Sequence, residues 1–110
     1  MRGNALRSQC DDLKHRIDRL DASARSVFFG FIRSTFQQLS DGYALASSAD
    51  RTRILNEVRQ ISRNLWDAGN RPQALALGVI MLNLESRLEV GDDADFVKAA
   101  TDALIKLASA

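Results

Sequence analysis

Few residues of this chain could do covalent or acid–base chemistry. The sequence holds one cysteine, Cys10, and one histidine, His15. On a single helix these side chains point about 140° apart around the axis, so they cannot form a thiolate–imidazole pair. Cys10 falls in an apolar seam and is expected to be a buried structural thiol, whereas His15 lies opposite that seam and is expected to be solvated. The sequence therefore predicts no nucleophilic centre built from these two residues.

A run of aspartates near the C-terminus is the second feature that could bind a ligand. Asp92, Asp93 and Asp95 lie close together, but they lack the alternating ligand spacing and the terminal glutamate of an EF-hand calcium loop. Capping and the helix dipole explain carboxylates at the start of a helix. The chain has no glycine-rich phosphate loop and no serine-centred nucleophile motif. We therefore expect no enzyme activity, no metal, no cofactor and no small-molecule substrate.

Four arginines form an alternative candidate site. Arg59 and Arg63 are i,i+4 neighbours on an expected helix, with Arg51 and Arg53 near its start and a further arginine, Arg71, at its other end. This pattern could bind phosphate, and a glycine-containing turn between two helices is typical of helix-turn-helix proteins. The helix after the turn is, however, the most apolar in the chain and offers no recognition face. Nucleic-acid binding through these arginines is therefore kept only as the alternative function.

The stretch that must position the other elements runs from Ala74 to Leu84. It has one polar side chain, Asn83, in eleven residues, and two apolar stripes at helical periodicity. A helix that is apolar on two sides has to be covered on two sides, by the rest of the chain or by a second copy. One stripe contains Leu75, Val79 and Leu82, and the other contains Leu77, Ile80, Met81, Leu84 and Leu88.

These stripes lead to the main functional hypothesis, a non-enzymatic regulatory or interaction protein that acts through an apolar helix face. Asn83 and Arg87 lie between the stripes, where a polar residue can set register or oligomeric state. Phe29 and Ile105 fall outside the apolar faces of their own helices. We expect a homodimer, or another protein partner, to cover one face of the central helix. The expected interface residues are Phe29, Leu77, Met81, Asn83, Leu84, Arg87 and Ile105.

Apolar periodicity elsewhere predicts one all-α domain over residues 1–110, an antiparallel bundle of four to five helices. An unbroken apolar seam from Leu6 to Phe31 slightly favours one long first helix that continues to about Leu39. The alternative is a break, with a second helix capped by Asp21 or Ser23. The sequence does not separate these two possibilities.

Turn-forming residues set the other expected boundaries. Residues 40–42 read Ser-Asp-Gly and predict a helix stop, followed by a loop or a short irregular turn over residues 43–49. The next helix is expected to begin at Ser48 or Asp50 and to end before Gly69, and Pro72 to open the central helix. Gly91 is expected to end the central helix. In the last helix, Phe96, Ala100, Ala103, Leu104 and Leu107 are expected to face inward and Ile105 outward.

Composition and charge limit the partners. Fifteen basic and fourteen acidic residues give a net charge of +1, which provides no electrostatic argument for nucleic acid or a membrane surface. Basic residues dominate positions 1–71 and acidic residues dominate positions 72–110, so the two parts could attract each other. The apolar run at 74–82 is far too short to span a bilayer, no signal-peptide pattern is visible, and one cysteine fits a reducing compartment. We expect a cytoplasmic protein without membrane contact.

Three motifs in the C-terminal half resemble a known family. Residues 63–66 read Arg-Asn-Leu-Trp, residues 77–80 read Leu-Gly-Val-Ile, and residues 91–96 read Gly-Asp-Asp-Ala-Asp-Phe. Together they resemble the flagellar biosynthesis regulator FlaF of alphaproteobacteria over about the last 45 residues, whereas residues 1–50 carry no likeness. The resemblance implies a small cytosolic helical protein that binds partners in flagellin synthesis or export rather than a catalyst.

Overall fold

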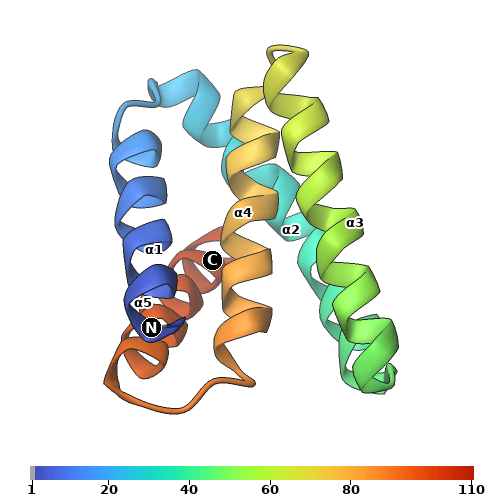
Figure 1. Ribbon diagram of the computed structural model, residues 1–110. Helices are drawn as coiled ribbons and strands as arrows, with labels where there is room; N and C mark the ends of the chain where they lie inside the picture. The colour runs from blue at the N-terminus through green and yellow to red at the C-terminus, as the bar shows by residue number, and fades with distance from the viewer. Residues whose placement is uncertain (1) are drawn as a thin grey trace.

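Five helices joined by short turns make up the fold (Figure 1). The structure, a computed structural model, describes residues 2–110, with side chains from Ala5 onward. The helices are α1 (Arg2–Asp18), α2 (Ala22–Leu45), α3 (Ser48–Asp67), α4 (Arg71–Ser86) and α5 (Asp92–Ser109). Residues 2–110 contain no strand. The predicted all-α bundle is confirmed.

The central helix of the bundle is α4. In Figure 1, α1 and α3 lie on opposite sides of α4, and α2 and α5 cross behind these three helices. α4 contacts all four of the others. Its segment Ala74–Leu84 is buried throughout, and even its most exposed side chain, Met81, is only 8% exposed. The prediction that this segment is covered on both sides is therefore confirmed, and the cover comes from the chain's own helices.

Different helices cover different sides of α4, and four apolar clusters result. Because α4 is apolar around most of its circumference, each neighbouring helix has to bring its own apolar stripe against it. The clusters are Leu75 and Val79 with Phe28, Ile32 and Ile105; Leu82 with Leu6, Cys10, Ala94 and Val97; Ile80 and Leu84 with Tyr43; and Leu77 and Met81 with Val58.

Two helices, separated by a short turn, stand where the sequence slightly favours one long first helix. α1 ends at Asp18, and the Asp21 side chain caps α2 by accepting a hydrogen bond from the N–H of Ala24 at 2.8 Å. The guanidinium of Arg25 donates to the carbonyls of residues 17 and 18 at the end of α1 and to that of residue 20 in the turn. The long helix is therefore wrong and the Asp21 cap is confirmed, because the side chains of Asp21 and Arg25 bond to backbone groups on both sides of the turn.

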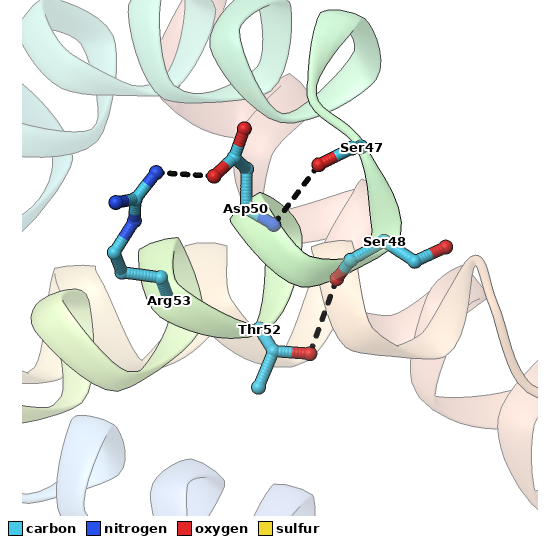
Figure 2. Close-up of polar contacts among 5 residues, drawn as sticks. All are labelled: Ser47, Ser48, Asp50, Thr52 and Arg53. Atoms are coloured by element: carbon cyan, nitrogen blue, oxygen red, sulfur yellow. Dashed lines mark hydrogen bonds and ion pairs between the residues drawn. The ribbon is translucent and has the colours of Figure 1, made fainter.

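α2 continues through the predicted stop at residues 40–42 and ends at Leu45. A glycine inside a helix costs about 1 kcal/mol, but Tyr43 lies one residue further on and is only 3% exposed, packed against Ile80 and Leu84. Burial of that ring outweighs the cost of Gly42. Only residues 46 and 47 separate α2 from α3, so the connection is shorter than predicted. Ser47 caps α3, because its hydroxyl accepts a hydrogen bond from the N–H of Asp50 at 3.2 Å (Figure 2).

The boundaries around α4 are partly as expected. Gly69 follows α3 with a φ of +88°, and Pro72 lies in the first turn of α4, as predicted. α4 ends earlier than predicted, at Ser86, and Gly91 with a φ of +120° instead precedes α5.

The inward face of α5 is rotated relative to the prediction. Ile105 is buried and Leu107 is 61% exposed, the reverse of the expected orientation. α5 packs against α1, α2 and α4 together, so three neighbours rather than one decide which of its side chains are covered. Its buried residues are Ala94, Val97, Thr101, Ile105 and Ala108.

One core group predicts a stability change. The Tyr43 hydroxyl is buried and has no hydrogen-bond partner among the described residues. A buried, unbonded hydroxyl costs free energy. We therefore expect Tyr43→Phe to raise the free energy of unfolding by about 1 kcal/mol in urea denaturation. A decrease of similar size would show that the hydroxyl is bonded in solution.

The same group predicts a pH dependence. Burial raises the pKa of Tyr43 above its ordinary value of 10.0; Arg51 opposes the shift and Glu85 adds to it. The folded state therefore holds this proton more tightly than the unfolded chain does, and stability should fall as the pH rises above 10. Tyr43 is the only tyrosine, so absorbance at alkaline pH reports its ionisation alone. Tyr43→Phe should lose this component of alkaline destabilisation; an unchanged pH profile would contradict the assignment.

Candidate functional site

Most residues expected at a partner interface lie inside the molecule. Leu77 is 4% exposed, Leu84 is 0% exposed, and Ile105 and Met81 are each 8% exposed. Leu77, Leu84 and Ile105 pack against neighbouring helices and present no surface to a partner, whereas Met81 also lines a cleft. The chain therefore leaves Leu77, Leu84 and Ile105 no exposed surface for the expected interface, because α2 continues to Leu45 and α5 turns its other face inward, and both help to cover α4.

Phe29 also contributes mainly to the core. It is partly buried and packs edge-on against Phe28, with ring centroids 5.1 Å apart and an interplanar angle of 71°. This geometry is the favourable T-shaped arrangement of two aromatic rings. Phe29 is therefore an edge of the core rather than a separate contact residue.

Asn83 and Arg87 form a polar network between helices. Asn83 is fully buried; its amide nitrogen donates to the Thr101 hydroxyl at 2.9 Å and to the Asp102 carboxylate at 2.7 Å. Its amide oxygen accepts from Arg87 at 2.8 Å, and Arg87 also donates to the Ser40 hydroxyl at 3.1 Å. The network joins α4 to α5 and α2, so the buried asparagine helps to fix how these helices pack within the chain.

The basic face expected of α3 does not form as a unit. Arg51 donates to two carbonyls at the end of α2, those of residues 43 and 44, at 2.9 and 3.0 Å. Arg53 pairs with Asp50 in the first turn of α3 (Figure 2). Both guanidinium groups therefore bind groups at nearby helix ends. Two of the four arginines expected to contact nucleic acid are thus engaged within the chain.

The other two arginines of that set face a groove. Arg59 lies 3.5 Å from Glu85 and also donates to Asn56 at 3.2 Å. Arg63 is exposed and pairs with no carboxylate among the side chains described. Arg59 and Arg63 both line a cleft of about 470 Å³.

The residues that line this groove come from α1 and α3 as its walls and from α4 as its floor. Figure 1 shows α4 between these two helices. Residues spaced i, i+3, i+4 and i+7 lie on one face of a helix, and α1 and α3 each contribute one such set as a wall. The wall residues are Gln9, Asp12, Leu13 and Arg16 of α1 and Arg59, Ser62, Arg63 and Trp66 of α3; Asp67 adds to the second wall, and the floor is Ala74, Leu75, Gly78, Met81 and Leu82 of α4.

Small side chains bring the walls close to the floor. A Cβ atom on Gly78 would lie only 3.1 Å from the Cδ2 atom of Leu13, so the glycine lets α1 approach α4. On the other side, the Ser62 hydroxyl donates to the carbonyl of Ala74 at 2.9 Å and ties α3 to the start of α4. The groove is therefore a fixed feature of the packing, with an apolar floor.

An arginine side chain reaches across the groove from one wall to the other. Arg16 of α1 pairs with Asp12 at 3.1 Å and places its guanidinium carbon 4.8 Å from the centre of the Trp66 ring on α3. Arg71, at the start of α4, lies at the same distance from that ring. Beyond this crossing a second hollow of about 690 Å³ continues along α1, where its lining adds His15, Arg19, Leu20 and Arg71.

Within the described residues, the cysteine, the histidine and the aspartate run do not come together in one site. Cys10 is 3% exposed in the core, as predicted, and His15 is exposed on α1, as predicted. Asp92, Asp93 and Asp95 lie in the first turn of α5, but none accepts a cap hydrogen bond, and Asp93 pairs with Arg7 of α1 at 3.3 Å. Among the described residues, no three potential metal ligands of the His, Cys, Asp and Glu types gather at one place.

The groove was only partly visible in the sequence. The i,i+4 pair Arg59 and Arg63 indicated a basic stripe, but nothing placed Arg16 and Arg71 beside Trp66, because these three residues come from three helices. Their juxtaposition depends on how α1 and α3 are arranged around α4, which no local pattern encodes.

Comparison with known proteins adds no assignment. No protein-family model, no curated protein and no solved structure matches the chain. The resemblance to FlaF therefore stays a prediction. Within residues 2–110, no helix combines the length and the apolar character needed to cross a lipid bilayer.

The Asn83 network predicts a large loss of stability on its removal. Asn83→Ala deletes three hydrogen bonds and leaves a cavity, so we expect the free energy of unfolding to fall by about 2–3 kcal/mol. The matched control is Asn64→Ala, which removes an exposed side chain of α3 that bonds only to Gln60 within the described region and should change stability by less than about 0.5 kcal/mol. Equal effects of the two substitutions would contradict the network.

The burial of Cys10 predicts low thiol reactivity. Desolvation raises the pKa of this thiol above 9.0, and only the thiolate attacks disulfide reagents. We expect the native protein to react with an aromatic disulfide reagent at least about tenfold more slowly than the chain in denaturant. Rapid, stoichiometric labelling of the native protein at neutral pH would instead identify a reactive cysteine.

Proposed function

We propose that this protein is a non-catalytic interaction protein that holds a segment of a partner protein in the groove between α1 and α3. The observation that carries the proposal is the groove itself, an apolar floor on α4 between two polar walls. An apolar floor rewards burial of apolar side chains, and polar walls give a docked segment hydrogen bonds and direction. A helix laid into a groove between two helices is a recurring mode of peptide recognition.

The proposed function is still that of a non-enzymatic interaction protein, as the sequence predicts. The contact surface is now the groove between α1 and α3 in place of a face of α4. The expected interface residues on α4 are covered by the chain itself, with Leu84 and Asn83 fully buried. That self-coverage removes the original reason for expecting a homodimer. In the groove, the partly exposed Leu13 and Trp66 of the walls lie above the buried α4 residues of the floor. The resemblance to FlaF would place the partner in flagellin synthesis or export, and that assignment stays a prediction.

Filling the groove should block partner binding. Gln9 is exposed and lines the groove, whereas its neighbour Ser8 is exposed but lies outside the lining residues. Amphipathic helical peptides can be selected from a random displayed library on the immobilised protein, and their affinity then measured by calorimetry. We expect Gln9→Phe to weaken a selected peptide by about tenfold or more and Ser8→Phe to leave it unchanged.

Two results would contradict this proposal. One is a selection that yields no peptide binder. The other is a set of binders whose affinity is the same for the parent protein, Gln9→Phe and Ser8→Phe, since such peptides would lie elsewhere on the surface. Both substitutions replace exposed side chains, so a circular dichroism melt close to that of the parent protein serves as the folding control.

A further inference from the structure

We infer that the segment held in the groove is an amphipathic helix whose polar flanks are acidic. This inference rests on the proposed function and names the chemistry of the partner. Three observations support it: the length of the groove, the excess of arginine along its walls, and the two guanidinium groups that lie over the ring of Trp66 at its centre.

The groove is long enough for a short helix. The two hollows share Asp12, Arg16, Trp66 and Leu75, so they are continuous past the Arg16 crossing. Along α4 the lining extends from residue 71 to residue 82, which at 1.5 Å per residue corresponds to about 17 Å, or roughly three helical turns. A compact small molecule would fill only part of this length.

Positive charge dominates the walls. The combined lining holds five arginines and only two aspartates, although the chain as a whole is nearly neutral. Arg16 is paired with Asp12 and Arg59 with Glu85. The remaining three arginines pair with no carboxylate among the side chains described; they are Arg19, Arg63 and Arg71.

Unpaired guanidinium groups beside an apolar floor select for carboxylates. Arginine binds carboxylates through two parallel N–H donors, and the low-dielectric floor strengthens that attraction relative to open solvent. A helix with leucine-like residues on one face and aspartate or glutamate on its flanks would pack the first against Leu13 and Trp66, which are partly exposed in the groove, and present the second to the arginines of the walls.

The tryptophan at the crossing argues against single-stranded nucleic acid. Bases bind such proteins by stacking on exposed aromatic rings. The Trp66 ring already has the guanidinium groups of Arg16 and Arg71 beside it, each 4.8 Å from the ring centre. The arginines are also arranged around an apolar floor, which a phosphate backbone cannot use.

Three designed peptides test the inference. Each is a helix of about 18 residues with the same leucine face, and the flanks are all glutamate, all glutamine or all lysine. Trp66 is the only tryptophan of the protein, so its fluorescence reports binding, and calorimetry gives the dissociation constants. We expect the glutamate peptide to bind at least about tenfold more tightly than the glutamine peptide at about 50 mM salt, with a smaller difference at about 300 mM.

Matched arginine variants localise the effect. Arg63→Gln and Arg71→Gln each remove an unpaired guanidinium from the walls and should each reduce the preference for the glutamate peptide. Arg53→Gln removes an arginine that lies outside the groove lining, paired with Asp50, and should leave the preference unchanged.

The outcomes separate this inference from the proposed function. If the glutamate and glutamine peptides bind equally well, and Gln9→Phe abolishes the binding of both, the inference that the partner is acidic is wrong. The same result would support the groove as the binding site. Failure of all three designed peptides, together with the failed library selection described above, would overturn both. Binding of a single-stranded oligonucleotide that is tighter than that of the glutamate peptide and weakened by Arg63→Gln would overturn the protein partner in favour of nucleic acid.

Discussion

The whole structure depends on covering one helix. Eleven consecutive residues of α4, Ala74–Leu84, are buried, and only Asn83 among them is polar. Burial of apolar surface is the dominant favourable term in folding, so the other four helices are arranged by the need to bring apolar stripes against every side of this one. The chain meets that need with its own residues, through an α2 that extends beyond a glycine and an α5 turned toward three neighbours.

This cover has a direct consequence for the surface. α1 and α3 both pack on α4, and they flank the groove that the lining residues define. Gly78 and Ser62 draw these helices close to the floor, and Arg16 reaches from one wall to Trp66 on the other. The candidate site is therefore a product of the same packing that stabilises the fold. The Asn83 network holds the opposite side, where it ties α4 to α5 and α2.

Local patterns in the sequence predicted the helices and the identity of the central one. They also predicted Gly69 and Pro72 as boundary residues, because a positive φ after a helix and a proline in its first turn are local requirements. They failed where two local signals compete. The continuous seam outweighed the Asp21 cap in the prediction, and Gly42 read as a stop although Tyr43 is anchored in the core.

The candidate site was harder to predict because it is assembled from three helices. The sequence indicated the Arg59 and Arg63 stripe but assigned the partner contact to α4 side chains that the structure buries. A hydropathy pattern shows that a face must be covered and does not show what covers it. Whether five short helices suffice depends on where α2 ends and on which way α5 turns.

Native-state hydrogen exchange tests most directly whether the chain covers α4 by itself. The account predicts that amides in the Ala74–Leu84 segment are among the most protected in the protein, and that their protection is the same in dilute and in concentrated solution. Protection that falls on dilution would contradict the account, because it would show that a second copy of the chain completes the cover.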